Sequence, residues 1–114
     1  MSSIITKTTT IVVGASQSDA IKMNQYMLTG ITTGSYLTST SLTFLGSDDG
    51  VTYYPLYNSA GEVLYTLTGS PMALTLEPLT FFGWNYLKLR RGNNGSPINQ
   101  TLTDAPINLI LRET

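Results

Sequence analysis

Asp48 and Asp49 are the only adjacent carboxylates in this 114-residue chain, and such a pair is where chemistry would first be sought. Two close carboxylates could hold calcium, or could act as a general acid and a general base. A calcium loop needs about six or more oxygen ligands, and no further acidic residues follow Asp49 at alternate positions. Catalysis would need another carboxylate from elsewhere, for which the candidates are Glu62, Glu77 and Asp104. Because Gly50 follows directly, we interpret Asp48, Asp49 and Gly50 as the turn of a β-hairpin.

Histidine and cysteine are absent from the sequence. Most serine, cysteine and zinc hydrolases need an imidazole as a base or as a ligand, so these mechanisms lose their central group. Without cysteine, disulfides and thiolate metal sites are excluded as well. We therefore expect a protein that is not an enzyme and that has no metal or other cofactor.

An aromatic set occupies the middle and later part of the chain, and its members are Tyr53, Tyr54, Tyr57, Tyr65, Trp84 and Tyr86. An exposed strip of such rings could stack against sugar rings or against a protein partner. The alternative is that at least half of these rings fill the core. Strand alternation is expected to place Tyr53 and Tyr57 on one face and Tyr54 on the other. Tyr54 and Trp84 are the candidates for outward contacts.

Basic residues gather next to the last of these aromatic residues. Lys88, Arg90 and Arg91 could form a patch with Tyr86 that pairs with a symmetry partner or with an acidic surface. The alternative is an ordinary solvated face of a strand. The candidate partner contacts are therefore Tyr54, Trp84, Tyr86, Lys88, Arg90 and Arg91.

The elements that must position these residues are β-strands. Residues 41–57 predict a hairpin, in which Leu42 and Phe44 supply alternating apolar positions before the turn. Asp49-Gly50 is the strongest turn signal, because glycine tolerates the positive φ of a primed turn.

Residues 1–14 are interpreted either as a strand or as an extended N-terminal arm. Such an arm could add a strand to the exposed sheet edge of a neighbour. The candidate arm residues are Ile4, Ile5, Thr6, Thr8 and Thr10. In that case, deletion of residues 1–13 should weaken assembly more than it weakens the fold.

The remaining segments complete a β-rich pattern. Residues 15–28 fit either a capped helix or an irregular strand, and we prefer the strand because its surroundings are β. Residues 92–97 have the composition of an exposed, mobile loop. About eight short strands with regularly spaced turns indicate an all-β fold, either an antiparallel β-sandwich or a jelly-roll-like barrel. Residues 1–114 are predicted to form a single domain.

Charge is sparse, with seven acidic and six basic residues and a net charge of −1, while serine and threonine make up about a quarter of the chain. Such a surface suits a protein that neighbours partly cover, because charged residues are depleted at the centres of interfaces. The alternative is simply a threonine-rich sandwich. The scattered basic residues predict no nucleic-acid binding, and no apolar run is long enough to span a membrane. No secretory signal is visible, so we expect synthesis in the cytoplasm.

Three segments of the chain resemble small structural proteins of tailed bacteriophages. They are the hairpin at residues 42–57 with its Gly-Ser-Asp-Asp-Gly turn, the aromatic-Gly-aromatic segment at residues 82–92, and the closing apolar strand at residues 107–112. The resemblance implies a virion protein of the capsid decoration, or cement, type, bound at three-fold or quasi-three-fold positions of the shell. It implies a homotrimer that contacts its own copies and the major capsid protein or another virion protein.

The same hairpin also resembles parts of discoidin-type sugar-binding sandwiches. The alternative function is therefore a carbohydrate-binding module or a tail-associated adhesin. The aromatic set and the loop at Asn93-Asn94 support that alternative. The sequence leaves open whether the protein belongs to the capsid or to the tail.

Overall fold

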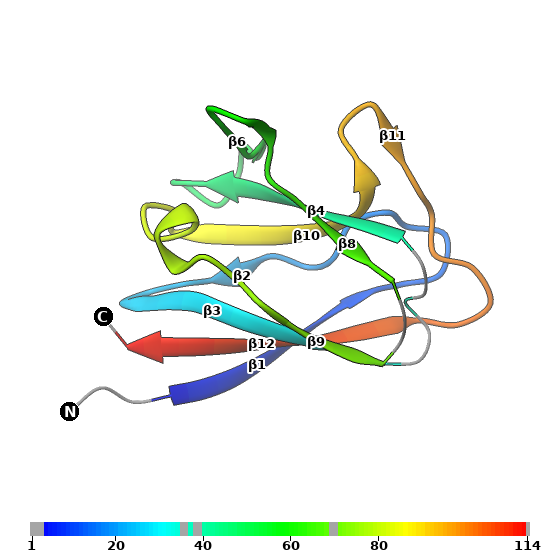
Figure 1. Ribbon diagram of the computed structural model, residues 1–114, viewed down its shortest axis with the longest axis horizontal. Coiled ribbons are helices and arrows are strands. Elements are labelled where there is room, and N and C mark those ends of the chain that lie inside the picture. Colours follow the sequence, from blue (N-terminus) through cyan, green and yellow to red (C-terminus); the bar gives the residue numbers. More distant parts are fainter. Residues whose placement is uncertain (1–3, 35–36, 38–39, 69–70, 114) are drawn as a thin grey trace.

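The structure is a computed structural model that describes residues 4–34, 37, 40–68 and 71–113. As the turn spacing predicts, it is an all-β sandwich of antiparallel sheets (Figure 1). The first sheet has four strands in the order β1-β12-β3-β9. Their bounds are β1 Ile4–Ile11, β3 Tyr26–Thr33, β9 Met72–Thr75 and β12 Ala105–Glu113.

The second sheet is built around β10 and β4, which pair with each other. β2 and β11 lie beside β10, and β5 and β8 lie beside β4. The bounds are β2 Ile21–Lys22, β4 Thr40–Ser47, β5 Tyr54–Pro55, β8 Leu64–Leu67, β10 Tyr86–Asn93 and β11 Ser96–Pro97. Between β5 and β8 the chain forms a small hairpin of β6 (Tyr57–Asn58) and β7 (Gly61–Glu62), and a short 3-10 helix, η1 (Pro78–Thr80), follows β9.

The strand pairs are nested along the chain. β1 pairs with β12, β2 with β10, β3 with β9 and β4 with β8, and successive pairs alternate between the two sheets. Such nesting is one long hairpin folded over on itself, which is the jelly-roll topology. The structure therefore adopts the jelly-roll alternative of the predicted fold class. As a consequence β1 and β12, which are far apart in sequence, lie side by side.

The core lies between the sheets, because apolar side chains alternate along each strand. On β10, Leu87 and Leu89 face inward and are fully buried. Phe44 of β4 packs against Phe81, with ring centroids 4.7 Å apart. Other fully buried residues are Ile11, Leu28, Leu42, Ile107, Leu109 and Leu111. Full burial of each such side chain is worth about 1.5–3 kcal/mol, so the core can hold the fold together without disulfides.

Residues 15–28 form β2 and the start of β3, which confirms the strand interpretation. The strand is irregular because its first part joins the edge of β10 through separate hydrogen bonds. The Ser18 amide donates to the Leu89 carbonyl at 2.8 Å, and the Arg91 amide donates to the Ser16 carbonyl at 2.8 Å.

The segment at residues 92–97 is the end of a hairpin, not an irregular loop. β10 continues to Asn93, which lies opposite Ser96 of β11. Asn94 and Gly95 are thus the two-residue connection between these strands. Asn-Gly is a strong hairpin signal, and the loop interpretation of this segment overlooked it.

Candidate interaction surfaces

The adjacent carboxylates lie in the loop between β4 and β5. The Asp49 carboxylate accepts hydrogen bonds from the amides of Val51 (2.8 Å) and Thr52 (3.0 Å) and from the hydroxyl of Ser47 (3.0 Å). These donors, the Thr52 amide foremost, hold the pKa of Asp49 below its ordinary value. Asp48 is exposed. Asp49 therefore shapes the loop, as carboxylates in Asx-turns do.

The loop is wider than a two-residue turn. Gly46 of β4 pairs with Tyr54 of β5, so the connection runs from Ser47 to Tyr53. Gly50 has φ +79°, and a Cβ at Gly50 would lie 2.9 Å from the ring of Tyr86. The loop thus folds across the outer face of the second sheet, with Gly50 resting on the Tyr86 ring.

The carboxylates that could have joined Asp48 and Asp49 in catalysis do not do so. Glu62 lies in β7 and binds Arg90, and Asp104 accepts a hydrogen bond from the Val13 amide. Within residues 4–34, 37, 40–68 and 71–113, no three acidic side chains gather in one place.

Lys88 lies on the same outer face of the second sheet, opposite the side that buries Leu87 and Leu89. Its ammonium group is 4.4 Å from the centroid of the Tyr53 ring, which is a cation–π contact. Burial, with smaller contributions from Tyr86 and Asp49, raises the pKa of Tyr53. Lys88 and Tyr86 are both half-buried. Much of the predicted basic patch is therefore taken up by contacts within the subunit.

Arg90 is only 4% exposed, so the prediction that it contacts a partner is wrong. Its guanidinium donates to the Glu62 carboxylate at 2.6 Å and to the Thr43 hydroxyl at 3.1 Å. Glu62 also accepts a hydrogen bond from the Asn94 amide at 3.1 Å. The β6–β7 hairpin, which carries Glu62, thus covers Arg90 and holds the turn of the β10–β11 hairpin.

Arg91 and Trp84 are half-buried. Arg91 donates to the Gln100 side-chain carbonyl at 3.0 Å, and so links β10 to the segment before β12. The Trp84 ring packs against the core, where a Cβ at Gly46 would come within 2.8 Å of it. Trp84 therefore points inward, contrary to its role as a candidate outward contact.

Two tyrosines are exposed near the edge of the second sheet. Tyr54, a predicted partner contact, is 60% exposed, and Tyr57 is 58% exposed. Tyr57 was predicted to lie on the opposite face from Tyr54. The small hairpin that begins at Tyr57 breaks the strand alternation on which that prediction depended.

The predicted N-terminal arm is an edge strand of the first sheet. From Ile4 to Ile11, each residue of β1 pairs with a residue of β12, so the strand alternative holds and the free arm is wrong for this subunit. Ile5 packs against the core, while Ile4, Thr6, Thr8 and Thr10 lie on the outward face of the strand.

Side chains of β1 also bridge the two sheets. The Thr9 hydroxyl, which is buried, donates to the Asp19 carbonyl at 2.9 Å, and the Lys7 ammonium donates to the Lys22 carbonyl at 3.0 Å. An inward-pointing lysine on an edge strand discourages pairing with a foreign strand. The edge of β1 is therefore poorly suited to strand addition.

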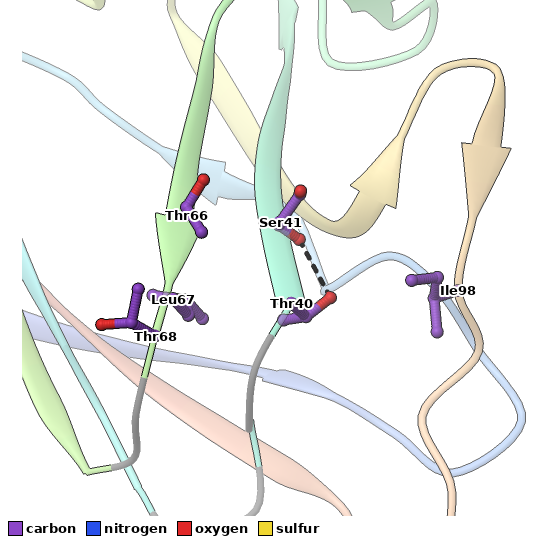
Figure 2. A pocket seen from close by; sticks show the side chains of 6 residues that line it. All are labelled: Thr40, Ser41, Thr66, Leu67, Thr68 and Ile98. Carbon is purple, nitrogen blue, oxygen red and sulfur yellow. Dashed lines mark hydrogen bonds between the residues drawn. The ribbon is translucent and has the colours of Figure 1, made fainter.

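An open hollow of about 530 Å³ lies where β4 begins and β8 ends (Figure 2). It is lined by Thr40, Ser41, Thr66, Leu67, Thr68 and Ile98. These side chains carry hydroxyl and apolar groups and no charge, so they suit neutral polar ligands and offer no acid or base. Sequence reasoning missed the hollow because its lining comes from three separate segments of the chain.

In the part of the chain that the structure describes, no helix is long and apolar enough to cross a membrane.

No protein-family model and no curated protein sequence matches the chain. Among solved structures, it is similar to the SPBc2 prophage-derived protein YomS, with 11% identity, 96% of each chain covered and a TM-score of 0.51. It is also similar to a carbohydrate-binding module, CBM32-1, of a family 31 glycoside hydrolase from Clostridium perfringens, with 14% identity, 91% and 82% of the two chains covered and a TM-score of 0.47. A third similar structure is the Tobacco streak virus coat protein, with 6% identity, 98% of this chain and 86% of that chain covered, and a TM-score of 0.45. The likeness to the prophage-derived protein shows a shared fold.

Proposed function

We propose that this chain is a non-enzymatic structural protein of a phage virion, where it decorates the capsid and stabilises it through contacts with its own copies and with the shell. Two similarities support the proposal. Residues 42–112 contain the segments that resemble phage decoration proteins. The fold is shared, over nearly the whole chain, with a prophage-derived protein.

The distribution of charge is the observation that carries the proposal. Arg90 and Glu62 bind each other, Lys88 lies on the ring of Tyr53, and Asp49 is held by its own loop. By contrast, the outward side chains of β1 are uncharged: Ile4, Thr6, Thr8 and Thr10. Because the centres of interfaces are depleted in charge, such a sheet face suits contact with another protein.

A decoration protein acts by mass action and needs no reactive group. If it binds the assembled shell and not the separated shell subunits, each bound copy raises the free energy of shell opening. At a free concentration of about 100 times the Kd, the gain is about 2.7 kcal/mol for each site.

The test is to count copies and to measure particle stability. We expect quantitative mass spectrometry of purified particles to find hundreds of copies in each virion. We also expect the purified protein to raise the temperature at which particles that lack it release their DNA. A small copy number would indicate the tail, and unchanged stability after binding would contradict a stabilising role.

The homotrimer is a prediction of the family resemblance. Sedimentation equilibrium of the purified protein tests it through the mass of the assembled species. A strict monomer at micromolar concentrations would count against both the trimer and self-contact.

Carbohydrate binding is the second candidate function, and the exposed rings of Tyr54 and Tyr57 favour it. Such rings stack on sugars. The hydroxyl-lined hollow lies at the opposite end of β4 from Tyr54, so the rings and the hollow would form separate contacts. Glycan-array binding that is lost in Tyr54→Ala or Tyr57→Ala, with the fold retained, would support this function. Trp84→Ala is a poor probe because Trp84 packs against the core. An array without binding would remove this candidate.

A further inference from the structure

The first sheet has an outer face on the side away from the core. Along its inner strand β12, this face has one charged residue at each end and none between them. Buried residues alternate there with outward ones, and the outward residues are Asp104, Pro106, Asn108, Ile110 and Arg112. Asp104 immediately precedes β12, and one of its carboxylate oxygens accepts a hydrogen bond from the Val13 amide. Arg112 lies near the end of β12, and both side chains are exposed. The face thus carries an acid at one end, a base at the other, and uncharged side chains between them.

The neighbouring strands add no further charge to this face. Pairing places Thr6, Thr8 and Thr10 of β1 on one side of β12, and Gly30 and Thr32 of β3, followed by Ala73 and Thr75 of β9, on the other. The Thr8 hydroxyl donates to the Asn108 side-chain oxygen at 2.7 Å, near the centre of the face. Among the described strand residues that point outward here, Arg112 is the one charged group.

We propose that this face binds a second copy of the chain, with a two-fold axis that lies parallel to the sheets, runs across the strands and passes by Asn108. The inference goes beyond the proposed function, because it concerns the free protein whether or not a shell is bound. It predicts a two-fold dimer in place of the homotrimer that the family resemblance implies. Asp104 and Arg112 lie at equal distances along the sequence from Asn108. With the two β12 strands antiparallel, Asp104 of each copy therefore faces Arg112 of its partner.

The charge pattern selects this arrangement over its alternative. If the two β12 strands ran parallel, Arg112 would face Arg112 and Asp104 would face Asp104, and like charges oppose association. In the antiparallel arrangement both ends of the interface carry opposite charges. A two-fold interface must be self-complementary, and the outer face of the first sheet meets that condition.

The dimensions of the face are compatible with such a dimer. Packed sheets lie about 10 Å apart and cross at roughly 30°, so an arginine and an aspartate from facing strands can meet. Three of the strands have eight or nine residues and β9 has four. With strands about 4.8 Å apart and a rise of about 3.3 Å per residue, the face covers roughly 450 Å² on each copy. The total of roughly 900 Å² lies slightly below the roughly 1,000 Å² expected of a stable specific interface, which is the range of weak complexes. We therefore expect association at micromolar concentrations, not a permanent dimer.

Charge reversal tests the pairing directly. Asp104→Arg gives a copy with a base at both ends, and Arg112→Asp gives a copy with an acid at both ends. By sedimentation velocity over a concentration series, each variant alone should self-associate about tenfold more weakly than the native chain, since two favourable ion pairs become repulsive. An equimolar mixture of the two variants should restore dimers, and added salt should weaken both the native and the mixed dimer.

The mixture also controls for damage to the fold, because a misfolded variant cannot be rescued by its partner. Native-like association of each single variant, or a mixture that stays monomeric, would overturn the proposal. So would a native protein that is monomeric at high concentration, or one whose self-association is a trimer that neither reversal affects. Shell binding and virion copy number are measured separately, so failure here leaves the decoration role open to its own test.

A substitution at the centre of the face provides a second, independent test. Asn108→Lys places two like charges beside the proposed axis, and it should abolish the dimer without changing the thermal stability of the monomer by more than a few degrees. Thr52→Lys is the matched control, because Thr52 is an exposed loop residue at the other sheet. Equal association of Asn108→Lys and Thr52→Lys would contradict the proposed interface.

Discussion

Gly50 joins a surface loop to the second sheet. Its φ of +79° lies in the left-handed region, and the Tyr86 ring lies directly against it. Gly50→Ala should therefore destabilise the protein twice, once through the backbone, at about 1–2 kcal/mol, and again by displacing the ring. Urea unfolding followed by circular dichroism measures the loss in free energy of unfolding.

Gly14→Ala is the matched control for that prediction. Gly14 has a similar φ of +88°, but a Cβ there would meet nothing within 4 Å. We expect Gly14→Ala to cost only the backbone strain, and Gly50→Ala to cost measurably more. Equal losses in the two variants would show that the contact with Tyr86 contributes nothing to stability.

The burial of Arg90 could not be predicted from the residues around it in the sequence. Strand alternation correctly separates it from the buried Leu87 and Leu89 on the other face of β10. Its burial depends on Glu62, which is distant in the chain and arrives on a hairpin that the periodicity of β10 cannot reveal. Arg90 therefore stabilises contacts within the subunit and is not available to a partner.

The β6–β7 hairpin is the element that closes over Arg90. The Arg90 and Glu62 side chains are 5% and 13% exposed, so the ion pair is largely removed from water. Glu62→Gln keeps an acceptor for the Asn94 amide but leaves the Arg90 charge unpaired. We expect it to lower the free energy of unfolding by about 3 kcal/mol, because an uncompensated buried charge is costly.

Replacing both partners separates the ion pair from the packing of the hairpin. The double variant Arg90→Met with Glu62→Gln should be less destabilised than Glu62→Gln alone, because no unpaired charge is then buried. The single variant Arg90→Met completes the comparison. If the double variant loses as much free energy of unfolding as Arg90→Met and Glu62→Gln lose together, the two groups do not interact and the role assigned to the ion pair is wrong.

Turn elements show why the presence of strands was easier to predict than their number, which is twelve and not about eight in the described residues, or their connection. The sequence contains two strong signals, Asp49-Gly50 and Asn94-Gly95. The first belongs to a wide loop, because the side chains of Ser47 and Asp49 capture backbone amides that a tight turn would leave to the strands. The second is the two-residue connection. Local residue type indicates that the chain reverses, but side-chain hydrogen bonds decide how wide the reversal is.

At the scale of the whole molecule, nested pairing joins the first strand, β1, to the last strand, β12, so each depends on the other for its hydrogen bonds. Alternating apolar residues were enough to predict an all-β sandwich or jelly roll, since the two share that pattern. The nesting that separates them comes from pairings between distant strands, which one sequence does not display. The same limit applies to the partner surface, since the charges of Asp104 and Arg112 share a face only once β12 is placed as a central strand.

The placement of β1 reverses the expected effect of N-terminal deletion. Removal of residues 1–13 would expose the edge of β12 along its pairing with β1, and would remove the buried side chains of Thr9 and Ile11. The truncated chain should therefore lose its cooperative unfolding transition or most of its stability, and any loss of assembly should follow from that. Urea unfolding and the dispersion of amide resonances measure this loss.

Point substitutions in β1 distinguish loss of a strand from loss of a contact surface. Ile11→Ala creates a cavity and should cost about 2–5 kcal/mol. Thr6→Ala, on the outward side, should change stability by less than about 0.5 kcal/mol. A truncated chain that keeps native stability while failing to assemble would restore the arm interpretation. That outcome would require β12 to tolerate a bare edge, which its central position between β1 and β3 argues against.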